Sequence, residues 1–125
     1  MTTLRTRSFR DLIVWQRAMA LCVAIYELTR CFPKEEVFGL SQQLRRAGVS
    51  MPSNIAEGYG RLSREQYRHF LGIAQGSNFE IQTQLAIARE LRLAPCSNLD
   101  PAEELSGEVG RILTSLLKRM PCTRA

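Results

Sequence analysis

The sequence has few of the residues from which metal centres and redox pairs are built. It contains one histidine, His69, and four cysteines that form no Cys-x-x-Cys pair. Zinc sites and dithiol motifs depend on such spacings, so neither they nor any other cofactor is predicted. A di-metal helical bundle needs Glu-x-x-His motifs, but the residue three before His69 is Gln66. The cysteine pattern favours a reducing, cytoplasmic compartment.

Long apolar runs are also missing. No stretch approaches the roughly 20 apolar residues of a membrane-spanning helix, and the N-terminal segment MTTLRTRSFRDL has no apolar signal region. Neither membrane insertion nor secretion is therefore predicted. Segments with the two-residue alternation of β-strands are lacking too, which leaves a helical protein.

The composition indicates one globular domain with a basic surface. At 125 residues and 45% hydrophobic content, the chain can build a single core without disulfides. Its net charge is +5, from 17 Lys and Arg against 12 Asp and Glu, and only Lys34 and Lys118 are lysines. Arginine presents a planar fork that suits phosphate and carboxylate, so an anionic partner is one interpretation. The alternative is a basic surface that only confers solubility.

Four segments carry apolar residues at three- and four-residue intervals, which predicts an all-α fold. The first runs to about Cys31, before Pro33. Ser8 and Asp11 have the spacing of a helix cap, although Phe9 could instead dock on the bundle.

The second helix is expected to start near Leu40 and to end at Gly58 and Gly60, and it contains a proline. Pro52 interrupts the hydrogen-bonding pattern, yet the apolar period continues in phase on both sides of it. We therefore expect one helix kinked at Pro52, with a break between Val49 and Pro52 as the alternative.

The third helix is expected from its cap at Ser63 to just before Pro95, and the fourth from its cap at Asp100, with Pro101 at its first position, to Pro121. Long helices with short connections predict an antiparallel, up-down-up-down four-helix bundle over residues 9–120. Residues 1–8 are expected to be flexible, and residues 121–125 to form a tail.

The first three helices carry more apolar surface than one bundle needs. Their extra side chains lie beside the core stripes, whereas the fourth helix is cleanly two-faced. We expect a homo-oligomer that packs through helices one to three; the alternative is ordinary scatter of exposed apolar side chains. These extra positions are Ile13, Ala20, Val23, Ala24, Val49, Pro52, Ala56, Ile73, Ile87 and Leu91.

Several polar residues lie on or beside the apolar stripes. They are interpreted as a polar network that fixes the bundle or an interface, because buried polar groups need partners. A catalytic carboxylate pair is not supported, because no nucleophile, base or metal ligands accompany it, so no enzymatic activity is predicted. The residues of this expected network are Asn54, Glu57, Asn78, Glu80 and Gln84.

Basic residues concentrate around the second helix and the start of the third. Repeated around an oligomer, they would attract a nucleic-acid backbone. The turn at residues 58–61 lacks a phosphate-loop pattern, although as a turn before a helix N-terminus it could hold one phosphate. Aromatic residues do not alternate with the arginines, so base-specific readout is not predicted. The candidates are Arg45, Arg46, Arg61, Arg64, Arg68 and His69.

Short motifs follow one another over residues 9–92. They are L-x-VWQ at 12–16, IY at 25–26, FP at 32–33, FGL at 38–40, QLRRA at 43–47, SNIAEG at 53–58, GR at 60–61, FL-x-IA-x-GS at 70–77 and QL at 84–85. Together they resemble the bacterial four-helix-bundle family of 23S rRNA intervening-sequence proteins.

This resemblance implies a homopentamer with a basic, funnel-like surface. It also implies kinship with the accessory variability protein of retroelements, which partners a reverse transcriptase and RNA. Arg45, Arg46, Glu57 and Arg61 occupy motif positions of the family. Two functions follow as hypotheses: a non-enzymatic accessory protein that binds an RNA or DNA backbone, or a homo-oligomeric scaffold without a nucleic-acid ligand.

Overall fold

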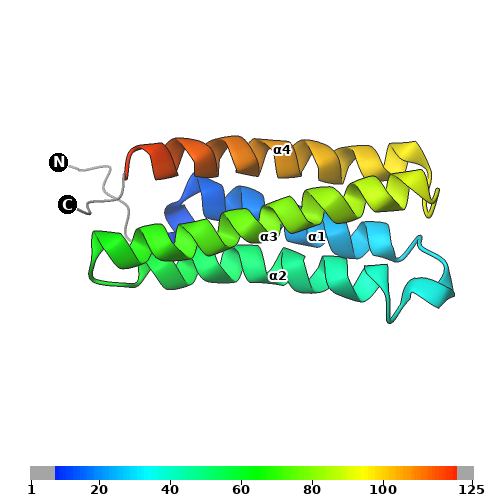
Figure 1. Ribbon diagram of the computed structural model, residues 1–125, viewed down its shortest axis with the longest axis horizontal. Coiled ribbons are helices and arrows are strands. Elements are labelled where there is room, and N and C mark those ends of the chain that lie inside the picture. Colours follow the sequence, from blue (N-terminus) through cyan, green and yellow to red (C-terminus); the bar gives the residue numbers. More distant parts are fainter. Residues whose placement is uncertain (1–7, 121–125) are drawn as a thin grey trace.

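The computed structural model describes residues 8–120, which form a bundle of four long helices (Figure 1). No strand occurs in this part of the chain, so the predicted all-α four-helix fold is confirmed. Its elements are η1 (Phe9–Asp11), α1 (Ile13–Thr29), η2 (Lys34–Glu36), α2 (Leu40–Tyr59), α3 (Arg64–Glu90) and α4 (Cys96–Lys118). The expectations for residues 1–7 and 121–125 lie outside the described residues.

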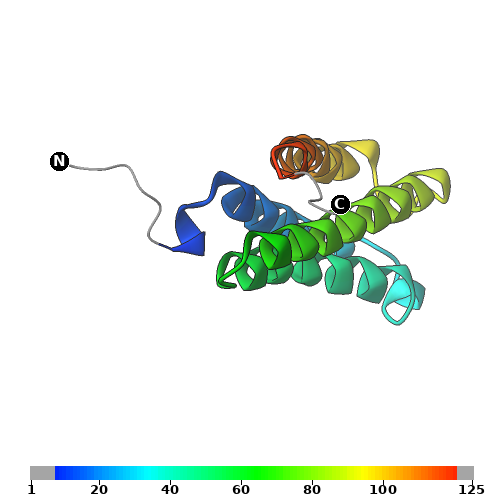
Figure 2. The ribbon, with the colours of Figure 1, turned by 60° about the vertical axis from the view of Figure 1, so that its left-hand side comes forward.

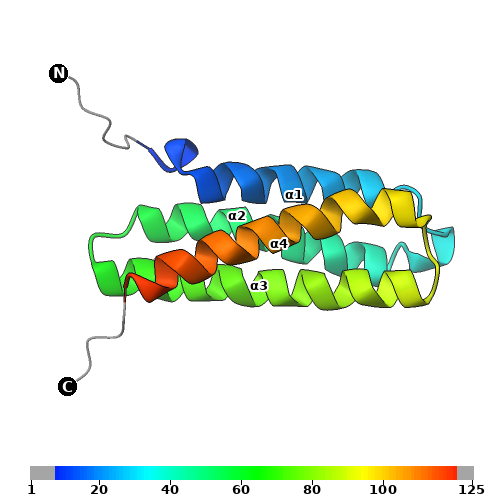
Figure 3. The same ribbon diagram turned by 90° about the horizontal axis from the view of Figure 1, so that it is seen from above.

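Each helix packs against two neighbours: α1 against α2 and α4, and α3 against α2 and α4. Helices α2 and α4 therefore lie on opposite sides of the bundle, as Figures 1 and 2 show. Side-chain pairs such as Ser50–Ser77 and Gln43–Gln84 show that α2 and α3 run in opposite directions. The turn between α2 and α3 and the end of α4 lie at the same end of the bundle (Figure 3).

The core is formed by the apolar stripes that the sequence indicates. In α1, Val14, Ala18, Leu21 and Ile25 are buried, one step of three or four residues apart. Burying a side chain as large as Leu or Ile contributes about 1.5–3 kcal/mol. The core also contains residues that the sequence did not indicate, among them Leu99 at the start of α4.

Two helices begin at places other than those predicted. The cap formed by Ser8 and Asp11 exists, but it begins the 3₁₀ turn η1; Leu12 is then extended, with φ −74° and ψ 127°, and α1 starts after it. Helix α4 starts at Cys96, not at Asp100, and contains Pro101 in its second turn. A proline there removes only one hydrogen bond near the helix start, while the earlier start buries Leu99 completely.

Helix α2 continues without interruption through Pro52, so the alternative of a break is wrong and the predicted kink stays a prediction. Pro52 is buried within the bundle. The prediction that it lies on an outer flank, available to another copy, is therefore wrong. Ser53 Oγ donates to the carbonyl of Val49 at 2.7 Å, and Asn54 Nδ2 donates to that of Ser50 at 2.8 Å. These bonds give side-chain partners to the carbonyls just before the proline.

Candidate nucleic-acid interface

The structure divides the six predicted basic residues into two groups. Arg45 and Arg46 lie in the first half of α2, near the connection from α1, whereas the other four lie at or after the end of α2. Between Arg46 and Arg61 the chain climbs roughly 20 Å along the bundle, at 1.5 Å per helical residue. The arginines that cluster in the sequence are therefore not one site.

Arg64 and Arg68 contact the end of α4. The guanidinium of Arg64 donates to the carbonyl of Arg119, and Arg68 Nε donates to the carbonyl of Met120. Carbonyls at a helix C-terminus lack partners within the helix and carry a partial negative charge, so cationic donors there are stabilising. The two contacts join the start of α3 to the end of α4.

This junction brings together basic residues that are distant in the sequence. Lys118 and Arg119, in the last turn and cap of α4, join the arginines of α3. The sequence analysis did not identify Lys118 and Arg119 as candidate ligands, because only the fold shows that the end of α4 lies beside the start of α3. We call this cluster the basic end: Arg61, Arg64, Arg68, Lys118 and Arg119.

Arg61 forms an ion pair with Glu57, one helical turn earlier. Its guanidinium also lies 5.0 Å from the centre of the Phe70 ring, and His69 meets the same ring edge-on at 5.3 Å. The Arg61 and Glu57 side chains are 42% and 51% exposed, so water screens the pair. Glu57 is thus a surface partner of Arg61 and not a member of a buried network.

Arg45 and Arg46 border an apolar groove between α1 and α2 instead. Arg45 Nε donates to Thr29 Oγ1 at 2.7 Å, and its guanidinium lies 4.9 Å from the centre of the Tyr26 ring. Arg46 has no hydrogen bond or ion pair within residues 8–120. The α1–α2 groove, of about 660 Å³, is lined in addition by Val37, Phe38, Gln42, Val49 and Ser50.

The amides of the expected network belong to separate contacts. Asn54 Nδ2 donates to Ser50 Oγ at 3.0 Å, and Ser50 Oγ lies 3.0 Å from Ser77 Oγ, which joins α2 to α3. Asn78 is fully buried: it donates to the carbonyl of Ser106 at 3.0 Å and accepts from Ser106 Oγ at 2.8 Å. The second pair joins α3 to α4.

Gln84 and Glu80 behave differently. Gln84 is 6% exposed, and its amide nitrogen lies 3.5 Å from Gln43 Oε1, while its own Oε1 has no hydrogen-bond partner among the described residues. Glu80 is exposed and forms no ion pair within residues 8–120. The structure therefore does not unite the predicted polar residues into one network.

Three side chains have raised pKa values, and in each case the cause is the packing or the hydrogen bonding of the bundle. Burial raises the pKa of the Cys22 thiol, which disfavours the reactive thiolate. Burial, and then the neighbouring Tyr59, raise the pKa of Tyr67. Hydrogen bonds to Glu103 and Asp100 raise the pKa of Arg89 in a cluster that joins α3 to α4.

Over residues 8–120, no three side chains of His, Cys, Asp or Glu come together as metal ligands would. Among the helices of that same stretch, none has both the length and the apolar character that crossing a membrane requires.

Comparisons with known proteins agree with the motifs. No curated protein matches the chain significantly. A solved structure from Bacteroides thetaiotaomicron, a protein of unknown function in the S23 ribosomal protein family, shares the fold: the TM-score is 0.76 at 23% identity, covering 85% of this chain and 99% of that one. Residues 10–115 match the sequence profile described as 23S rRNA-intervening sequence protein. The chain belongs to this family of 23S rRNA-intervening sequence proteins.

Proposed function

We propose that the protein is a non-enzymatic, homo-oligomeric accessory protein that binds the backbone of RNA or DNA through its basic end. The observation that carries the proposal is the junction of α3 and α4, where Arg64 and Arg68 bind the two carbonyls that directly follow α4, beside Lys118 and Arg119. Five cations from three segments thus gather at one end of the bundle.

The contacts of these arginines leave them able to bind phosphate. A guanidinium has five N–H donors, and a bond to one carbonyl leaves the others free. Phosphate contacts of this kind are electrostatic and independent of sequence, and they weaken as salt rises because binding releases counterions. Repetition of the basic end around an oligomer would strengthen the field.

The distribution of exposed apolar side chains supports self-association. None of the large, exposed apolar side chains of the described residues lies on α4. A contact through α1 to α3 would leave α4 and the basic end open to a ligand. The exposed side chains are Ile13, Met19, Val23, Tyr26, Val37, Phe38, Val49, Leu62, Ile73, Ile87 and Leu91, besides Phe79, which lies beside α4 and is not counted toward this surface.

A second candidate function is that of a homo-oligomeric scaffold without a nucleic-acid ligand. Arg46 and Glu80 favour it, because both are exposed and neither has an ion-pair partner in the described part of the chain. In a scaffold, such charges would pair between copies. Arg46 also borders a mainly apolar groove, which is typical of a protein contact.

Binding to structured RNA, measured at several salt concentrations, tests the first proposal. The variant combines Lys118→Ala with Arg119→Ala, which removes two charges but keeps the backbone carbonyls that Arg64 and Arg68 contact. We expect weaker binding and a plot of log affinity against log salt that is flatter by about 2.

The matched control combines Lys34→Ala with Arg92→Asn, which removes the same charge at the other end of the bundle. Asparagine suits the positive φ of 54° at position 92. Equal effects of both pairs, or no binding at low salt, would overturn the proposal. In a further arm, Arg45→Ala with Arg46→Ala is expected to leave RNA binding intact; loss of the oligomer in this variant would support the scaffold.

A further inference from the structure

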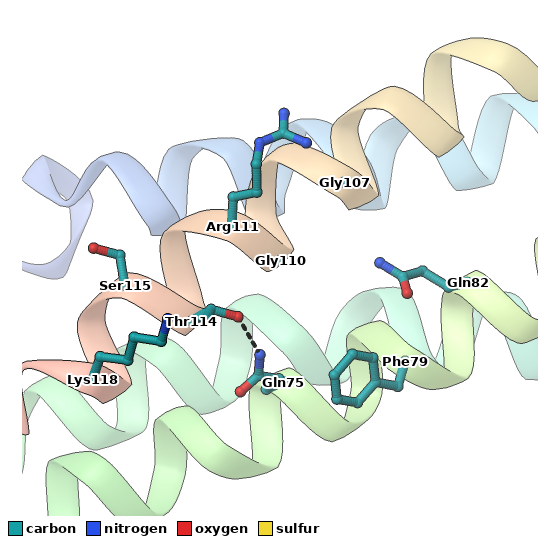
Figure 4. Close-up of a pocket in the computed structure, with 9 residues that line it drawn as sticks. All are labelled: Gln75, Phe79, Gln82, Gly107, Gly110, Arg111, Thr114, Ser115 and Lys118. Carbon is teal, nitrogen blue, oxygen red and sulfur yellow. Dashed lines mark hydrogen bonds between the residues drawn. The ribbon is translucent and has the colours of Figure 1, made fainter. Parts of the chain in front are cut away.

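A hollow lies between α3 and α4, on the side of the bundle that the proposed self-association leaves open. Its volume is about 480 Å³ (Figure 4). Phe79 and Gln82 line it from α3, and Gly107, Arg111 and Lys118 line it from α4. We call it the α3–α4 hollow.

Two glycines keep the α4 wall of the hollow open, for different reasons. A Cβ at Gly110 would lie 3.1 Å from Nδ2 of the buried Asn78, so a larger residue there would press on the Asn78 amide. A Cβ at Gly107 would meet only the tip of the flexible Arg111 side chain, at 3.4 Å. Glycine inside a helix costs about 0.5–1 kcal/mol relative to alanine. Core packing does not account for the glycine at position 107, where the α4 wall of the hollow carries no side chain.

The charges around the hollow are positive. No acidic residue lines it, and neither Arg111 nor Lys118 has an ion-pair partner within residues 8–120. Of the acids near it, Glu108 binds Arg17 of α1 at 3.1 Å and Glu103 binds Arg89, whereas Glu80 and Glu104, which do not line the hollow, have no ion-pair partner among the described residues. Since Lys118 also belongs to the basic end, the hollow continues from it.

The α3–α4 hollow is also lined by an aromatic ring, Phe79, and by a side-chain amide, Gln82. Phe79 is 57% exposed, and Figure 4 shows its ring lying along α3 between Gln75 and Gln82, with the Gln82 amide directed towards α4. Gln82 has no hydrogen-bond partner among the described residues. Gln75 Nε2 donates to Thr114 Oγ1 at 2.9 Å, which holds the two helices at this width. Proteins that bind single strands combine these groups: bases stack on aromatic rings, cations follow the phosphates, and amides bond base edges.

We infer that the α3–α4 hollow takes an unpaired nucleotide of a single strand. Its base stacks on Phe79, Gln82 bonds the edge of the base, and Lys118 faces the phosphates, while Arg111, whose guanidinium points away from α3 in Figure 4, adds positive charge at the rim. The inference rests on the proposed function and narrows it, because a base within a duplex is stacked between its neighbours and cannot reach Phe79. The hollow is therefore specific for single-stranded nucleic acid, whereas the basic end binds the phosphate backbone of either a single strand or a duplex.

Fluorescence anisotropy with a labelled oligoadenylate, and with a labelled RNA duplex, tests the inference on the full chain. Phe79→Ala is expected to weaken single-strand binding by about tenfold, the effect of losing one stacked base, and to leave duplex binding unchanged. Phe79→Trp is expected to retain single-strand binding. Phe38→Ala is the matched control, because Phe38 is an aromatic side chain 88% exposed in the separate α1–α2 groove.

The outcomes separate the two proposals. If Phe79→Ala leaves single-strand affinity unchanged, or if Phe38→Ala lowers it equally, the inference is wrong, while duplex binding would still support the proposed function. If the wild type binds neither RNA at low salt, both fail. If adenosine monophosphate displaced the labelled strand at concentrations as low as unlabelled oligoadenylate does, the hollow would be a site for free nucleotides and the strand proposal would be wrong.

Discussion

Asn78 is buried completely between α3 and α4, where Ser106 satisfies it through both its carbonyl and its hydroxyl. Such a reciprocal pair ties one position on α3 to one position on α4, since a shift of either helix would leave a buried amide unpaired. The same register sets Phe79 opposite the open wall at Gly107 and Gly110.

Replacement of Ser106 by alanine tests this role. The variant keeps the backbone carbonyl of position 106 but leaves Asn78 Oδ1 without its donor. We expect the free energy of unfolding to fall by about 1–3 kcal/mol, the cost of an unsatisfied buried polar group. Urea denaturation measures it, with the exposed Ser115→Ala as a control that should stay within about 0.5 kcal/mol. Equal midpoints for the two variants would contradict the role of the pair.

Sequence reasoning could place Asn78 but not its partner. Its position falls on the apolar stripe of α3, so its burial follows from the helical period. Ser106 also falls on the helical period of its own helix, beside Val109 and Leu113, but the sequence does not show that this position faces Asn78. For the same reason Arg64 and Arg68 could be identified as candidate ligands, whereas their contacts with α4 depend on where that helix ends.

At the scale of the helices, the sequence predicts that each helix exists more reliably than it predicts the residue at which the helix starts. Asp100 and Pro101 form a good starting signal, yet α4 begins at Cys96, because burial of Leu99 outweighs the loss of one hydrogen bond near the helix start. Pro52 likewise does not end α2, whose apolar stripe is buried on both sides of it. Packing overrides local preference in both cases.

Two glycines, in α2 and α3, provide a test of how closely these helices pack. A Cβ at Gly58 would lie 2.7 Å from Cβ of Phe70, so Gly58→Ala must push α2 and α3 apart. We expect a loss of about 1–3 kcal/mol in the free energy of unfolding. A Cβ at Gly72 would meet nothing within 4 Å, so Gly72→Ala should gain about 0.5–1 kcal/mol.

Thermal and urea unfolding of both variants measure whether the free energy of unfolding falls for Gly58→Ala and rises for Gly72→Ala. Because the substitution is chemically the same, each variant serves as the control for the other. A destabilised Gly72→Ala would show that something outside the bundle, such as another copy, packs on α3 at that position. A neutral Gly58→Ala would show that the α2–α3 contact is looser than the structure indicates.

At the scale of the whole molecule, exposed apolar side chains belong to the first three long helices and their connections, whereas the basic end lies where α3 begins and α4 ends. Exposed side chains such as Ile73 and Ile87 follow α3 on the side towards α2, whereas α4 exposes no large apolar residue among those described. The sequence predicted this difference, because the stripes of the first three helices are wider than one core needs. It did not predict the basic end or the α3–α4 hollow, which combine residues from distant helices.

Sedimentation of the intact protein tests the proposed self-association. We expect a mass several times the 14.2 kDa of one chain at micromolar concentration. Ile73→Asp with Ile87→Asp places two carboxylates on the α3 face and should yield monomers, since an unpaired buried charge is costly in an interface. Ser97→Asp with Ser115→Asp adds the same charge to α4 and should leave the oligomer intact. A monomeric wild type, or dissociation by the α4 pair alone, would show that the apolar side of the bundle is not the contact between copies.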